Sequence, residues 1–161
     1  MRPRPVGAGA RLLLAGALAL AGCGYSVSAG LKLRGGVERA EVRPFENLST
    51  DPSVGVEVTS ALREALARRG ASGGGGRALI DGQVLTDTVP PSFAGGATQR
   101  VALVVRARLS VDGALAVERV VRRETDYLTG ADALEGEARR AQALQRLAGE
   151  AARDVLSALE D

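Results

Sequence analysis

The sequence contains one cysteine and no histidine, and the surroundings of Cys23 indicate what its thiol does. Three arginines and no acid occur among the first eleven residues, and a short run of Leu, Ala and Gly follows from Leu12 to Leu20. A basic segment followed by such a run is typical of a secretory signal, and the run is well short of the roughly 20 apolar residues of a spanning helix. We therefore predict that residues 1–22 are a cleaved signal peptide.

The stretch Leu20-Ala21-Gly22-Cys23 resembles the bacterial lipobox, in which the cysteine receives a thioether-linked diacylglycerol and becomes the acylated first residue. The alternative is an ordinary signal cut near Gly22 or Gly24, which would leave an unpaired thiol in an oxidising compartment. Two or three acyl chains hold a protein on a membrane far better than one. Gly24 stands where an Asp retains such lipoproteins at the inner membrane of enteric bacteria, so the outer membrane is the predicted location.

A second group of residues suited to chemistry is a set of arginines on two neighbouring segments. They are Arg100, Arg106, Arg108, Arg119, Arg122 and Arg123. Guanidinium groups match phosphate geometry, so this set is a candidate binding surface for a phosphorylated glycolipid head group. The alternative is a solvated sheet face whose arginines pair with Glu118, Glu124 and Asp126. Nucleic acid is not expected as the ligand, because the predicted location is the cell envelope and only four Tyr and Phe residues are available for stacking.

The remaining composition argues against an enzyme, a metal site or a cofactor. Removing residues 1–22 takes three arginines from the 21 basic side chains, leaving 18 against 19 acidic ones, so the formal charge falls from +2 to −1. The mature chain therefore lacks a general attraction for polyanions. It has no histidine, its one cysteine is assigned to lipidation, and no pair of carboxylates has a spacing that suggests acid–base catalysis.

Periodicity predicts the elements that position these residues. Val37 to Phe45 is predicted as a strand that ends near Pro44, followed by a turn over residues 46–50. Asp51 and Pro52 predict the start of a helix, and Gly70 its end. ASGGGG at residues 71–76 predicts a flexible connection, because no Lys-Ser/Thr pair follows as in a phosphate-binding loop.

Three strands and a second helix are predicted in the C-terminal half. Residues 78–89 alternate with the exception of Leu85, and Phe93 falls in the loop that follows. Residues 100–111 alternate most regularly, Asp112-Gly113 predicts a hairpin turn, and residues 115–127 return with a pattern that leaves the face of Arg119 and Arg123 open. Asp132 and Glu135 have capping-box spacing, and a stripe from Ala138 to Leu159 predicts a helix of about seven turns.

The predicted order is therefore strand, helix, three strands, helix. This order predicts an α+β fold, a two-layer sandwich in which a four-stranded mixed sheet carries two helices on one face. The predicted organisation is a signal peptide at 1–22, an acylated N-terminus and tether at 23–36, and a single domain at 37–161.

Three stretches are similar to the family of lipopolysaccharide-assembly lipoproteins LptE. They are the lipobox with Cys23-Gly24-Tyr25, the segment Pro44-Phe45-Glu46-Asn47 with the helix centre Thr59-Ser60-Ala61-Leu62-Arg63 and its end Arg68-Arg69-Gly70, and the final helix from Ala138-Arg139-Arg140. The resemblance implies a lipoprotein that plugs the outer-membrane barrel LptD, helps it assemble and contacts lipopolysaccharide, with the six arginines as candidate contacts. The alternative is a scaffold lipoprotein of a secretion or trafficking complex.

Overall fold

The computed structural model describes residues 30–89 and 98–161. The predicted signal peptide, the predicted lipidation site Cys23 and the loop residue Phe93 lie outside these ranges. None of the helices within them is long and apolar enough to cross a membrane.

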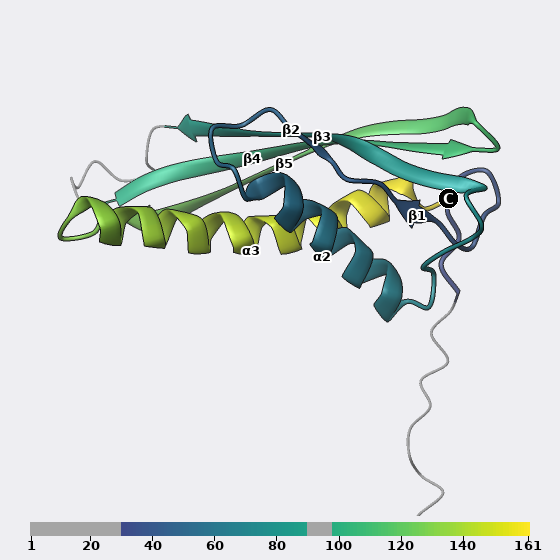
Figure 1. The fold of residues 1–161 in the computed structure, drawn as a ribbon, viewed down its shortest axis with the longest axis horizontal. Helices are drawn as coiled ribbons and strands as arrows, with labels where there is room; N and C mark the ends of the chain where they lie inside the picture. The colour runs from purple at the N-terminus through teal and green to yellow at the C-terminus, as the bar shows by residue number, and fades with distance from the viewer. Residues whose placement is uncertain (1–29, 90–97) are drawn as a thin grey trace, which may run out of the picture.

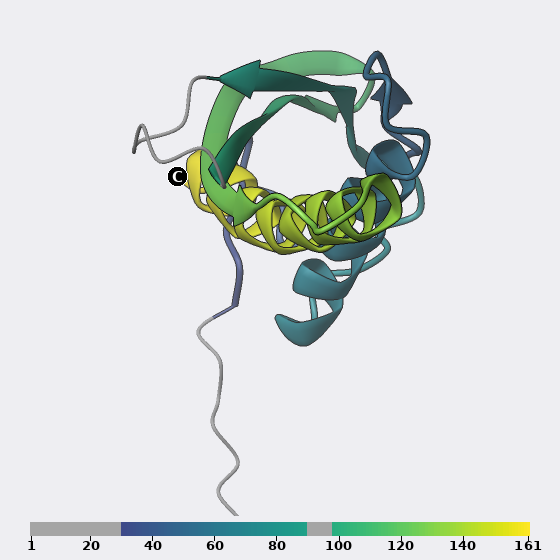
Figure 2. The ribbon, with the colours of Figure 1, turned by 90° about the vertical axis from the view of Figure 1, so that its left-hand side faces the viewer.

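The fold is a mixed β-sheet covered on one side by two helices, as the sequence predicts (Figure 1). The elements are β1 (Glu41–Val42), β2 (Glu46–Asn47), α2 (Val54–Arg68), β3 (Ala78–Val89), β4 (Thr98–Val111), β5 (Ala114–Leu128) and α3 (Ala133–Leu159). β3 pairs antiparallel with β4 and β4 with β5, whereas β1 and β2 both pair parallel to β3. Viewed from one end, the curled sheet arches over α3 (Figure 2).

The core is built on the strict alternation of β4. Val101, Leu103, Val105, Ala107 and Leu109 are all buried, and they face the helices. The intervening Arg106 and Arg108 are exposed on the other side. The two-residue turn is also as predicted, because Asp112 and Gly113 both have positive φ, 51° and 81°, as a tight hairpin requires.

The first predicted strand is wrong in detail. The segment from Val37 to Phe45 forms only β1, and the predicted turn contains β2, at Glu46–Asn47. The chain breaks between them at Pro44, which has no N–H to donate to the ladder. Both short strands nevertheless pair with the same partner, so together they occupy the position of one interrupted edge strand.

The predicted start of α2 at Asp51 and Pro52 is wrong in detail. The helix begins at Val54, and its N-cap residue Ser53 makes no side-chain cap hydrogen bond. The carboxylate of Asp51 instead accepts hydrogen bonds from Thr86 Oγ1 at 2.7 Å and from Arg140 Nη2 at 2.8 Å. Asp51 therefore ties the β2–α2 turn to β3 and to α3.

The start of α3 agrees with the sequence, but its buried stripe begins later than predicted. Asp132 accepts a hydrogen bond from the Glu135 N–H, as a capping residue should. Ala138 and Ala141 are exposed, and the continuous buried face begins at Ala143. The first turns pack through polar contacts instead, since Arg139 reaches the carbonyl oxygen of Thr129 and Arg140 reaches Asp51.

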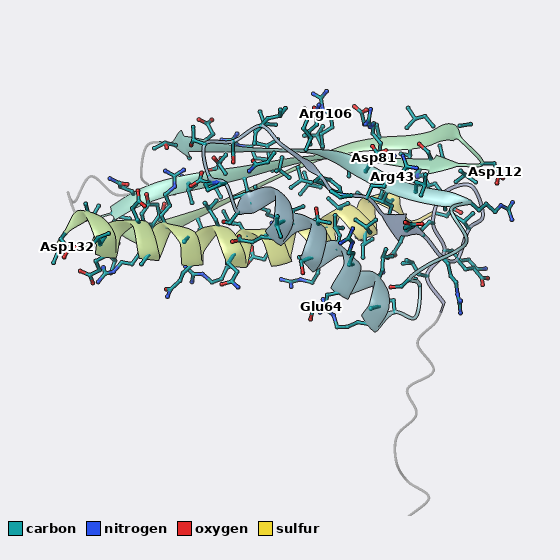
Figure 3. The ribbon with its side chains drawn as sticks, viewed as in Figure 1. Arg43, Glu64, Asp81, Arg106, Asp112 and Asp132 are labelled. Carbon is teal, nitrogen blue, oxygen red and sulfur yellow. The ribbon has the colours of Figure 1, made fainter. Side chains whose placement is uncertain are left out.

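Residues 31–36, predicted as the end of the tether, pack on the domain. Leu31 and Leu33 are buried, and Leu33 forms bridges with Val37 and Glu160. The backbone N–H of Arg34 donates to the carbonyl oxygen of Leu159. The start of the described chain is thereby fixed beside the C-terminus, at the same end of the molecule as the hairpin turn with Asp112; Asp132 lies at the opposite end (Figure 3).

One glycine is required by a close approach between β3, β4 and the aromatic ring of Phe45. A Cβ at Gly82 would lie 1.9 Å from the carbonyl oxygen of Arg106 and 2.7 Å from Cε1 of Phe45. Phe45 is buried, and its N–H donates to Oγ1 of Thr59 in α2 at 3.0 Å. Gly82 thus lets the ring pack closely against the sheet.

Gly82→Ala should destabilise the domain by about 1–3 kcal/mol or more, because the added methyl group must push apart backbone and ring. Gly149→Ala is the matched control, since a Cβ there meets no atom closer than Nη1 of Arg153 at 4.0 Å. In the interior of α3 that change should stabilise by up to about 1 kcal/mol. Urea unfolding of both variants measures the difference; equal stabilities would contradict the close packing at Gly82.

Candidate functional site

The structure settles which face of β5 each arginine occupies. Arg119 is opposite Ala107 and Arg123 is opposite Leu103, and both partners belong to the buried row of β4. Arg119 and Arg123 therefore lie on the helix side of the sheet. The other four candidates lie together on the side away from the helices, hereafter the outer face: Arg100, Arg106, Arg108 and Arg122.

Carboxylates surround the four outer arginines. Arg100 Nε lies 2.7 Å from Asp126 Oδ1, Arg108 Nη2 lies 2.8 Å from Asp81 Oδ1, and Arg122 Nε lies 2.8 Å from Glu124 Oε1. Arg106 has a looser contact, 3.9 Å from Nε to Glu118 Oε1. The three acids that the sequence suggests as arginine partners, Glu118, Glu124 and Asp126, each form an ion pair with an outer arginine.

The outer face is consequently close to electrical neutrality. Its four guanidinium groups are balanced by the carboxylates of Asp81, Asp87, Glu118, Glu124 and Asp126. An anionic ligand must therefore compete with these carboxylates for the arginine hydrogen bonds. The length and exposure of each ion pair therefore indicate which arginine can bind an anion better than the number of arginines does.

Arg106 is the most available of the four. Its side chain is 55% exposed, against 26% for Arg100. Each of the other three arginines has a carboxylate oxygen within 2.8 Å, whereas the contact of Arg106 with Glu118 is 3.9 Å long. It points away from the helices (Figure 3). Arg106 is therefore the guanidinium best placed to accept a new anionic partner without breaking a short ion pair.

An apolar row crosses the outer face beside these arginines. Leu85 is directly opposite Val104, and Val120 is opposite Arg106 on the next strand. Leu85 is 39% exposed and Val120 57% exposed. The departure of Leu85 from the alternating pattern of residues 78–89 was the sequence signal for this row. The outer face thus combines apolar surface with guanidinium groups.

The two inner arginines have different partners. Arg119 Nη1 donates to the carbonyl oxygen of Glu118 at 2.9 Å, whereas Arg123 forms an ion pair with Asp154 of α3. The hydrogen bond from Arg123 holds the pKa of Asp154 below its ordinary value of 3.8 and raises the pKa of Arg123. The ion pair between Arg123 and Asp154 joins β5 to α3.

Two grooves lie beside α2 in the part of the chain that the structure describes. One groove, of about 650 Å³, lies between β1 and α2, where Arg63 Nη2 donates to the carbonyl oxygen of Val42 at 2.9 Å. A second groove of 310 Å³ is lined by Phe45, Val56 and Thr59 among others. Within the described ranges, no group of three or more His, Cys, Asp or Glu residues is arranged to hold a metal ion.

The geometry defines a small α+β domain with a helix-covered side and an open amphipathic side, and the same fold occurs in two lipoproteins and in PelC. Rare lipoprotein B from Shewanella oneidensis is 16% identical with a TM-score of 0.54, covering 71% of this chain and 91% of its own. A minor lipoprotein from Acinetobacter baumannii is 14% identical with a TM-score of 0.51, covering 76% and 91%. PelC from Paraburkholderia phytofirmans, a dodecamer, is 16% identical with a TM-score of 0.52, covering 82% and 94%.

The sequence itself identifies the family. The model of the LptE lipopolysaccharide-assembly family matches residues 37–159, and the chain belongs to this family. No match was found among curated proteins. The family consists of non-enzymatic lipoproteins, so the chain is not an enzyme, and membership agrees with lipid anchoring at the outer membrane.

The Arg123–Asp154 pair predicts a dependence of stability on pH. Because the folded-state pKa of Asp154 is lowered, the stabilisation is complete above the unfolded-state pKa of about 3.8 and is lost as pH falls through the lower folded-state pKa. Asp154→Asn should therefore flatten the fall in unfolding free energy in this acidic range, as measured by urea titrations at several pH values. Arg123→Gln should flatten it similarly, and an unchanged slope in both variants would contradict the pairing.

Proposed function

We propose that the protein is anchored in the outer membrane through acylated Cys23, plugs and helps to assemble the barrel LptD, and contacts lipopolysaccharide. The observation that carries this proposal is the family match over nearly the whole domain, residues 37–159. The lipobox at the start of the chain supplies the anchor.

The fold supports anchoring of a defined end of the domain. Only six residues separate Cys23 from Gly30, the first described residue, so the anchor lies within about 25 Å of it along a fully extended chain. Leu33 is held against Val37 and Glu160, which fixes where the tether leaves the domain. The end that carries the C-terminus therefore stays close to the membrane surface.

The outer face supports contact with lipopolysaccharide. That ligand carries both phosphate groups and acyl chains, and the face combines guanidinium groups with the row of Leu85, Val104 and Val120. Arg106 is the preferred phosphate contact, because it is the most exposed and the most loosely paired of the four outer arginines. Arg100, Arg108 and Arg122 surround it as further candidates. Arg119 and Arg123 are weaker candidates, since they face the helices.

A scaffold subunit of a secretion or trafficking complex is the second candidate function. The fold similarity to the PelC dodecamer favours it, because the same architecture serves in a multi-subunit assembly there. Affinity purification of the lipidated protein distinguishes the two: an outer-membrane barrel in equal amount supports the proposal, whereas a soluble periplasmic complex supports the alternative.

Cys23→Ser should block acylation, because the serine hydroxyl does not replace the thiolate that attacks the lipid donor. Mass spectrometry should then find an unprocessed precursor with the signal peptide still attached, whereas the unaltered protein should be cleaved and carry acyl chains. Identical masses and identical membrane retention after detergent-free washing would overturn the lipoprotein assignment.

Charge reversal on the outer face should weaken lipopolysaccharide binding. Arg106→Glu with Arg108→Glu should lower the affinity of the purified lipoprotein in detergent by about tenfold or more, through loss of charge-assisted hydrogen bonds. Arg146→Glu with Arg153→Glu on the exposed side of α3 makes the same change in net charge and serves as the control. Circular dichroism verifies folding. Equal affinities in the two double variants would leave the arginines as parts of a solvated surface.

A further inference from the structure

The two edges of the sheet are protected very differently. At the β1–β2 edge, α2 satisfies backbone groups: Arg63 donates to the carbonyl oxygen of Val42, and Thr59 accepts from the N–H of Phe45. β5 is the last strand at the other edge, and within residues 30–89 and 98–161 it pairs with β4 alone. A long strand with unpaired N–H and C=O groups is a template for another strand.

A shallow groove of about 460 Å³ runs beside this open edge. Val121, Arg122 and Arg123 line it from β5, and Asp154, Ser157 and Ala158 line it from α3. Successive strand residues point to opposite faces, so a groove that contacts both Arg122 and Arg123 must follow the edge of the strand. The small side chains of Ser157 and Ala158 leave room beside the strand.

The residues at the middle of β5 are suited to pairing. Residues 117–123 read VERVVRR, with three valines and no proline to prevent ladder formation. Val120 is 57% exposed in the centre of this stretch. The strand therefore has both exposed apolar surface and an edge that no other described strand pairs with, although the carbonyl oxygen of Glu118 accepts a hydrogen bond from the Arg119 side chain.

The charges along β5 select the partner and the register. If a second copy pairs antiparallel with Val120 opposite its own equivalent, each Glu118 lies opposite Arg122 of the other copy. Centring the pair on Val121 instead places Arg119 opposite Arg123 and Glu118 opposite Glu124. Centring it on Arg122 places Arg122 opposite itself and Glu118 opposite Asp126. Like charges directly opposite destabilise a sheet, so the register centred on Val120 is favoured.

We propose that two copies of this chain associate through antiparallel pairing of β5 about a two-fold axis at Val120, with Glu118 and Arg122 forming two reciprocal cross-strand ion pairs. The sheet then continues across both copies, with the helices of both on one side. The pairing covers the open edge while the lipoprotein is not engaged with another partner. This pairing goes beyond lipopolysaccharide contact, although Val120 and Arg122 also belong to the outer face proposed for that contact.

Disulfide trapping in membranes tests the proposal with the full lipidated protein. Val120→Cys introduces the single free thiol, because Cys23 is acylated, and directly opposed residues in an antiparallel pair have Cα atoms about 4.5–5.5 Å apart, within disulfide reach. Under mild oxidation this variant should run as a reducible dimer on a denaturing gel. Leu128→Cys is the matched control, since its position on the same strand is equally exposed, at 58%, but far from the axis.

The ion pairs supply a second, independent measurement. In the Val120→Cys background, Glu118→Arg should lower the cross-linked fraction about fivefold, because it places two arginines opposite each other. Adding Arg122→Glu should restore the original fraction by exchanging the charges. Cross-linking at Val120 no greater than at Leu128, a fraction insensitive to Glu118→Arg, or a mixed disulfide with a different protein in place of the dimer would each overturn the proposal.

Discussion

The burial of one face of β4 is the constraint on which the rest of the structure depends. Five successive inward side chains from Val101 to Leu109 are almost completely removed from water by α3 and its neighbours. Because side chains alternate along a strand, burying these residues places Arg100, Arg106 and Arg108 on the opposite side. The open amphipathic face is thus a direct consequence of the way the core is built.

The segment Pro44-Phe45-Glu46-Asn47 has a structural explanation in this chain. Phe45 packs over Gly82, and Gln83 Nε2 donates to Glu46 Oε2 at 2.8 Å beside it. Asn47 Nδ2 donates to the carbonyl oxygen of Asp51 at 2.8 Å and so shapes the turn into α2. These residues therefore hold the edge strands and the first helix in place.

The sequence predicts most accurately those elements whose patterns are local. The alternation of β4, the Asp112-Gly113 turn and the Asp132 cap each depend on neighbouring residues alone, and all three agree with the structure. Asp51 could not be assigned, because its partners Thr86 and Arg140 are 35 and 89 residues away. The side of the sheet on which Arg123 lies could not be predicted either, because it depends on a register shift near Leu109 and on the distant Asp154.

The near neutrality of the outer face changes what a binding site here requires. Exposed ion pairs contribute only about 0–1 kcal/mol each, so a phosphate that offers bidentate hydrogen bonds can replace a carboxylate at small cost. Such a face has little long-range attraction for anions, however, because its arginines and carboxylates cancel at a distance. Affinity must then come from contacts made after the ligand has arrived. The row of exposed Leu85, half-buried Val104 and exposed Val120 is the part of the face able to recognise acyl chains in addition to phosphate. A ligand that presents both groups together is therefore favoured over a simple polyanion.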